Sequence, residues 1–65
     1  MNHFERGDRV RITAGEAKGR VGIINYIIQP NSQVSGYGYF VKLDGKLPWF
    51  AESELEMAKE QVVFT

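Results

Sequence analysis

The chain has 65 residues, of which eight are lysine or arginine and eight are aspartate or glutamate, so its formal net charge at pH 7 is zero. It contains no cysteine, which excludes disulfides and thiolate metal sites and is typical of a reducing compartment, so we expect a cytoplasmic location. Its apolar stretches are shorter than the roughly 20 residues of a membrane span. Residues 1–20 carry no signal-peptide pattern, and we expect one soluble domain with a small core.

The first predicted strand covers residues 9–13 and follows a turn signal, Gly7-Asp8. Polar and apolar residues alternate along it with period two, which places Val10 and Ile12 on the buried face. Residues 14–19 then form a compact loop between two glycines, which accept positive φ at little cost.

The second predicted strand covers residues 20–28, which are rich in β-branched residues. Two sets of side chains compete for its buried face: Val21, Ile23 and Ile27 against Ile24, Tyr26 and Ile28. We therefore expect the strand to bend, burying first one face and then the other. Gly22 lies inside this strand, where glycine weakens pairing, and it predicts the close approach of another strand or of an aromatic ring.

Residues 29–36 read as a polar loop, and residues 37–43 as a third strand with Tyr39, Val41 and Leu43 on one side. The dipeptide Asp44-Gly45 predicts a tight hairpin turn, because both residues accept positive φ.

A fourth strand is predicted at residues 47–51, and Pro48 marks it as an edge, since proline cannot donate to a ladder. Residues 51–54 suit a single 3₁₀ turn, and residues 55–57 a short fifth strand. Residues 62–64 in the tail are apolar enough to add a strand or to meet a second copy, so self-association through strand edges or through Val62–Phe64 is an open alternative.

Short strands separated by turns predict an all-β fold, a small barrel or sandwich. We expect a five-stranded barrel, because a barrel leaves few open strand edges. Its expected core consists of Val10, Ile12, Ile24, Val41, Leu43, Phe50 and Leu55. Five of the eight basic residues fall in residues 1–22 and five of the eight acidic residues in residues 44–65, and we expect the two ends to pair in the folded chain.

The glycine-rich opening, G-D-x-V-x-I-x-x-G-x-x-K-G-x-x-G-x-I over residues 7–24, resembles a KOW motif, as found in ribosomal proteins and in the C-terminal domain of NusG transcription factors. Residues 39–43 and 49–56 resemble the closing half of other SH3-like barrels, such as the small stromal subunit of photosystem I and the variable chain of ferredoxin–thioredoxin reductase. The resemblance implies a single SH3-like barrel over residues 1–58, with a KOW-like unit at 7–27 and a tail at 59–65.

An enzyme is not indicated, because the one histidine, His3, stands apart from the serines and no cysteine is present. We expect no catalytic residue, no metal and no cofactor. The opening strand is also similar to that of type II dihydrofolate reductases, a remote alternative. Those enzymes line their pore with Val-Gln-Ile-Tyr, whereas this chain has Leu-Pro-Trp-Phe at residues 47–50.

Two kinds of binding remain open. Eight aromatic residues exceed what one small core needs, so some should anchor a protein partner at the surface. The candidate protein-binding residues are Tyr26, Tyr37, Tyr39 and Trp49. The alternative is RNA, for which the candidate residues are Arg9, Arg11, Lys18 and Arg20, and the KOW resemblance implies that residues 14–20 contact it. The zero net charge counts against strong RNA binding.

Overall fold

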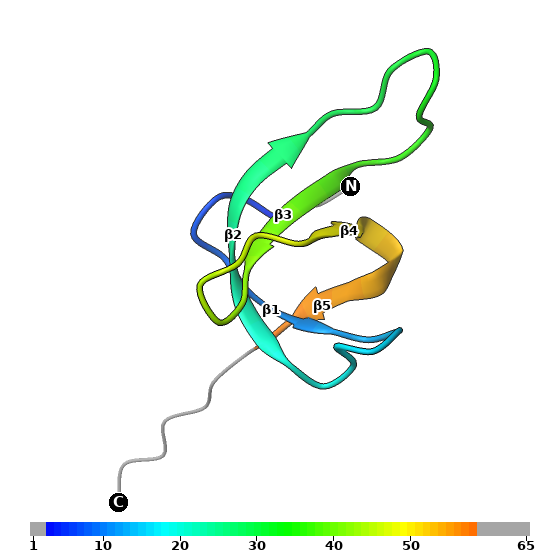
Figure 1. Cartoon of the computed structure of the whole chain (residues 1–65). Coiled ribbons are helices and arrows are strands. Elements are labelled where there is room, and N and C mark those ends of the chain that lie inside the picture. Colours follow the sequence, from blue (N-terminus) through cyan, green and yellow to red (C-terminus); the bar gives the residue numbers. More distant parts are fainter. Residues whose placement is uncertain (1–2, 59–65) are drawn as a thin grey trace, which may run out of the picture.

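The computed structural model describes residues 3–58 as an all-β chain whose strands form one antiparallel sheet (Figure 1). Five strands pair in the spatial order β4-β3-β2-β1-β5. The elements are β1 (Arg9–Ile12), β2 (Val21–Ile28), β3 (Gly38–Lys42), β4 (Trp49–Ala51), a 3₁₀ turn η1 (Glu52–Glu54) and β5 (Leu55–Met57). The predicted elements are therefore all present and in the predicted order.

The first hairpin joins β1 to β2 through the predicted glycine loop. Val10 and Ile12 are fully buried, as the alternation predicted. Gly15 and Gly19 both adopt positive φ, at +82° and +91°. The Gly19 amide donates a hydrogen bond to the Ile12 carbonyl oxygen at 2.8 Å, which closes the loop directly beyond β1. Glycine is needed at both positions because other residues rarely adopt this conformation.

The competing apolar faces of β2 are reconciled by a β-bulge. Ile24 pairs with Val41 of β3, whereas Tyr26 pairs with Phe40, so Asn25 is an extra residue without an opposite partner. Ile24 is buried before the bulge, and Ile27 packs against the core after it. The predicted bend is confirmed, and the extra residue moves Tyr26 to the side that faces solvent.

Gly22 lies on the buried side of β2, close against residues 41–43 of β3 and its end. A Cβ at this position would stand 2.5 Å from the carbonyl oxygen of Lys42 and 2.6 Å from Cγ1 of Val41. The predicted close approach of another strand is therefore confirmed. Any side chain here would have to push a backbone carbonyl of β3 aside.

The second hairpin turns at Asp44 and Gly45, whose φ angles are +51° and +79°. Leu43 and Lys46 flank this turn and exchange two backbone hydrogen bonds of 2.9 and 2.8 Å. The predicted tight turn is confirmed, and β4 lies at an edge of the sheet, as Pro48 indicated. The fourth strand is shorter than predicted, because pairing with β3 begins only at Trp49.

The core lies on the inner side of the coiled sheet. It contains Val10, Ile12, Ile24, Tyr39, Val41, Leu43 and Leu55, with Phe50 only partly buried at its margin. No ladder joins β4 to β5 within residues 3–58, so the hydrogen-bonded sheet keeps two edges, which η1 connects along the chain. The predicted contribution of Val62–Phe64 lies outside the described residues.

Within residues 3–58, no helix has the length and apolar character needed to cross a membrane.

Candidate functional site

The four aromatic residues predicted at the surface occupy three different environments. Tyr26 and Trp49 are exposed, with 56% and 47% of their surface accessible. Tyr37 is half-buried directly before β3, at the end of the sheet where the residues before β1 lie. We call this the open end of the sheet. Tyr39 is fully buried, so its prediction as a surface anchor is wrong.

Tyr39 is buried because its place in β3 is on the same side as Val41, and because the residues before β1 cover it. Phe4 packs against the Tyr39 ring edge-to-face, with the ring centroids 5.4 Å apart. Burial raises the pKa of the Tyr39 hydroxyl, and the carboxylate of Glu52, which accepts a long hydrogen bond from it at 3.4 Å, raises it further. Tyr39 thus contributes to packing and not to the outer surface.

Three aromatic side chains line up across the outer side of β2, β3 and β4. Tyr26 is the register partner of Phe40, and Phe40 is in turn the partner of Trp49. We call these three residues the outer aromatic row. The Tyr26 and Phe40 rings meet edge-to-face, with centroids 6.4 Å apart and an interplanar angle of 81°. The row continues through Phe40, which the sequence analysis had not singled out as a candidate.

Gly38, two residues before Phe40 in β3, leaves room for the indole of Trp49. A Cβ added at Gly38 would overlap Nε1 of Trp49 and stand 2.7 Å from Cε2 of the same ring. The edge of the indole that carries Nε1 therefore lies against the backbone of β3 at Gly38. Nearly half of the surface of Trp49 remains accessible.

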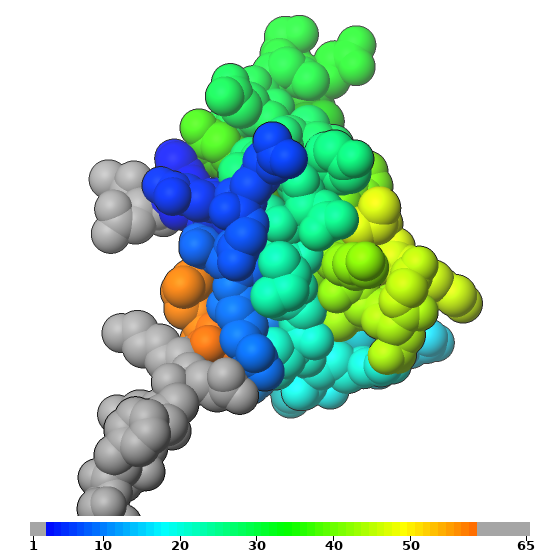
Figure 2. Space-filling model, turned by 90° about the vertical axis from the view of Figure 1, so that its left-hand side faces the viewer, coloured from blue at the N-terminus to red at the C-terminus, as the bar shows by residue number. Residues whose placement is uncertain are grey.

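Aliphatic side chains extend the row along β2. Val21, Ile23 and Ile28 are 36%, 39% and 40% exposed, and all three occupy outward positions of the strand. Figure 2 looks onto this side of the molecule, with β2 in cyan and green between β1 in blue and the yellow-green β3 and β4. An apolar stripe therefore covers the outer face at the centre of the sheet.

Two of the four basic residues predicted for RNA binding form ion pairs with acidic residues of the described part of the chain. Nη1 of Arg11 lies 3.0 Å from Oε2 of Glu56, and the Arg20 guanidinium pairs with Asp44. These two pairs agree with the predicted pairing between the chain's ends. Arg9 lies on the outer side of β1, and Lys18 is exposed in the loop between β1 and β2. The structure does not bring the four residues together in one site.

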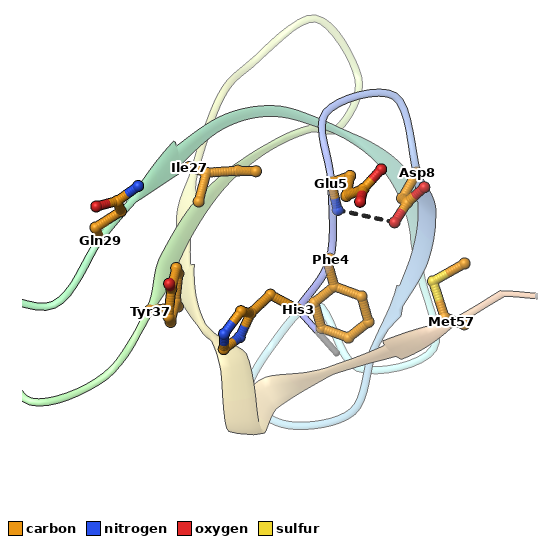
Figure 3. A pocket seen from close by; sticks show the side chains of 8 residues that line it. All are labelled: His3, Phe4, Glu5, Asp8, Ile27, Gln29, Tyr37 and Met57. Carbon is orange, nitrogen blue, oxygen red and sulfur yellow. Dashed lines mark hydrogen bonds between the residues drawn. The ribbon is translucent and has the colours of Figure 1, made fainter. Parts of the chain in front are cut away.

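A pocket of about 720 Å³ opens between the residues before β1 and the end of β2 (Figure 3). The His3 ring stacks on Tyr37 with centroids 3.8 Å apart, and its Nδ1 lies 3.4 Å from Oε1 of Glu52. On the other side stand Glu5 and Asp8, where Asp8 Oδ2 accepts a hydrogen bond of 2.8 Å from the Glu5 amide. The sequence analysis missed this region, although Phe4 was an apolar signal in the segment before the first strand.

The described residues do not group histidine, aspartate and glutamate in a way that could hold a metal ion: residues 3–58 contain no cluster of three such side chains. The candidate site is the outer aromatic row together with the exposed aliphatic side chains of β2. The KOW and SH3-like resemblances depend on the glycine spacing and on the closing strands alone. No protein-family model matches the chain, and no curated protein and no solved structure matches it either.

Proposed function

We propose that this chain is a small, non-enzymatic binding module that holds a protein partner against its outer aromatic row. We further propose an SH3-like barrel of the KOW type, in which the coiled sheet is completed by the return of β5 to β1 after η1. The sheet order and the 3₁₀ turn before the last strand support that fold.

The observation that supports a binding role is the composition of the outer face. An antiparallel sheet with one face on the core normally presents polar side chains on the other. Here the outward positions of β2 carry Val21, Ile23, Tyr26 and Ile28, and the next two strands add Phe40 and Trp49. Contiguous apolar surface of this kind is typical of sites where another molecule binds. Aromatic side chains are also the usual anchors of protein interfaces.

RNA is the second candidate, because aromatic rings beside basic side chains also bind single-stranded nucleic acid. Lys42 and Arg9 stand on the outer face near the row. Two features count against RNA: Arg11 and Arg20 are engaged in ion pairs, and the aliphatic side chains of β2 offer no stacking surface.

Affinity capture from a cell lysate with a variant lacking the row tests the proposal. The bait is the whole chain, used as wild type, as a Tyr26→Ala and Trp49→Ala double variant, and as Val34→Ala. Val34 is a matched control, since it is 45% exposed in the loop between β2 and β3. We expect a protein that the wild type and the control recover and the double variant loses, with and without nuclease. Recovery only in the absence of nuclease would support RNA instead, and equal recovery by all three baits would contradict the proposed surface.

Self-association through strand edges or through Val62–Phe64 and a cytoplasmic location are further proposals from the sequence. The same preparation tests the first, by sedimentation of the purified chain.

A further inference from the structure

Most of the charged side chains on the outer face of the strands are cations. Among the strand residues that face outward, the charged side chains are Arg9, Arg11, Lys42 and Glu56, three cations against one carboxylate. That carboxylate is already paired with Arg11. Glu5 and Asp8, by contrast, line the pocket between the residues before β1 and the end of β2. Among the outward-facing strand residues the cations therefore outnumber the carboxylates, which the zero total charge does not reveal.

The cations stand beside the apolar stripe in a defined register. Ile23 of β2 has Arg9 as its partner on β1 and Lys42 as its partner on β3. Lys42 is exposed, and it forms no ion pair with any side chain in residues 3–58. Lys42 and Phe40 are two residues apart on the same side of β3, which corresponds to about 7 Å along the strand. Arg9 and Lys42, on either side of Ile23, thus form a basic row. It runs parallel to the outer aromatic row and is two residues away from it along β3.

From this arrangement we propose that the partner is an acidic peptide segment, with an apolar side chain seated on the outer aromatic row and a carboxylate near it that pairs with Lys42. This inference rests on the proposed function and names the chemistry of its partner. An extended segment places residues i and i+2 on one side at about 7 Å, so an apolar residue and an acidic residue in that spacing match the two rows. The pairing adds specificity for acidic segments to the affinity that the aromatic row supplies.

The geometry favours a peptide over a nucleic-acid strand. The Tyr26 and Phe40 rings meet at 81°, so they do not present the parallel faces on which successive bases stack. Ile23, which lies between the two cations, is 39% exposed and matches an aliphatic side chain. Cations on both sides of Ile23 would attract the phosphates of an RNA strand, and an aliphatic side chain between them is a poor contact for a phosphate.

The lone tryptophan of the chain lies in the proposed site, so binding can be followed by its intrinsic fluorescence. The probe is a displayed library of random peptides of about 12 residues, selected on the full chain with the Tyr26→Ala and Trp49→Ala double variant in solution as competitor. We expect the enriched peptides to combine aspartate or glutamate with large apolar residues. The most enriched peptide, once synthesised, should bind the wild type and change the emission of Trp49.

Two charge reversals then test the role of Lys42. Lys42→Glu should weaken binding of the selected peptide about tenfold, because a favourable charge contact becomes a repulsive one. Lys46→Glu is the matched control, since Lys46 is the bridge partner of Leu43, which faces the core and not the outer side, and it should change the affinity less than about twofold. Replacing the acids of the peptide by the corresponding amides should weaken binding to the wild type and not to Lys42→Glu.

The outcomes separate the two proposals. Neutral or basic peptides among the binders, or equal affinity for Lys42→Glu and wild type, would overturn the acidic partner and leave the protein-binding role intact. Failure to enrich any peptide that depends on Tyr26 and Trp49 would overturn both. In that case a titration with oligouridylate of about ten nucleotides, quenching Trp49 with a steep salt dependence, would establish RNA as the ligand.

Discussion

The molecule has two aromatic clusters, and they differ in what covers them. At the open end, Phe4 packs on Tyr39, and His3 stacks on Tyr37, so these rings cover one another. On the outer face, Tyr26 and Trp49 are about half exposed. Tyr39 and Phe40 are neighbours in β3, and the side of the sheet on which each lies decides which cluster it joins. Aromatic content alone therefore says nothing about binding until the register of the strands is known.

The largest expected effect compares a residue from each cluster. Tyr39→Ala should destabilise the fold by about 3–5 kcal/mol, because it removes a fully buried ring and leaves a cavity. Tyr26→Ala should change the free energy of unfolding by less than about 1 kcal/mol, since the ring lies mostly in water. Urea denaturation followed by circular dichroism measures both. Equal losses would mean that the outer row stabilises the sheet as much as the core does.

A second prediction tests the close approach of β2 and β3 at Gly22. Gly22→Val should cost about 3 kcal/mol, because its Cβ would meet the Lys42 carbonyl oxygen, a backbone atom that cannot move without disturbing the ladder. Gly36→Val is the control, since no atom lies within 4 Å of a Cβ at Gly36. The same denaturation experiment applies, and a Gly22→Val protein as stable as the control would show that the strands can separate freely.

The third prediction concerns the seat of the indole. Gly38→Ala would place a methyl group where the Trp49 ring lies, so the ring should swing away from β3 into solvent. Because a surface side chain can move, we expect a loss of only about 1 kcal/mol, together with a red shift of the tryptophan emission. Gly36→Ala should leave the emission unchanged. An unshifted spectrum in Gly38→Ala would mean that the ring is not held over the glycine.

Much of this architecture could be predicted from local sequence. Alternation predicted the inner face of β1, the Asp44-Gly45 pair predicted the tight turn, and Gly22 predicted the close contact of two strands. These features depend on residues close together in the chain or on a glycine that has one physical purpose. Even the conflict within β2 carried information, because it anticipated the bulge that the register shift reveals.

The environment of Tyr39 could not be predicted in the same way. Its side of β3 was predicted correctly with Val41 and Leu43, yet it was expected at the surface because seven other residues were taken to fill the core. Phe50 fills less of the core than expected, and Phe4 covers the end of the sheet from a segment without periodicity. The contact between His3 and Glu52 joins residues 49 positions apart, a distance over which local patterns carry no information.

The arrangement of the candidate surface likewise depends on contacts that local sequence patterns do not reveal. Tyr26 and Trp49 were predicted as exposed, but their alignment through Phe40 depends on the bulge at Asn25, which sets the register between β2 and β3. The placement of Lys42 beside Ile23 follows from that register as well. The zero net charge had counted against strong RNA binding, and it could not show which basic side chains lie on the outer face, because that depends on the folded register.

The smallest expected effect is on the pH dependence of stability, and it concerns Tyr39 in the buried cluster. Burial and the Glu52 carboxylate raise the pKa of Tyr39 above its usual value near 10, so the folded chain keeps this proton when the unfolded chain has lost it. The stability that this contributes is fully present below about pH 10 and is lost as the pH rises through the pKa of the folded state. Tyr39→Phe retains the ring and should therefore flatten the fall in unfolding free energy above about pH 10, while leaving stability at neutral pH within about 1 kcal/mol of wild type. Urea denaturation across the alkaline range measures the slopes of the wild type and of Tyr39→Phe, and a Tyr39→Phe slope as steep as that of the wild type would show that the hydroxyl ionises in the folded protein as easily as in water.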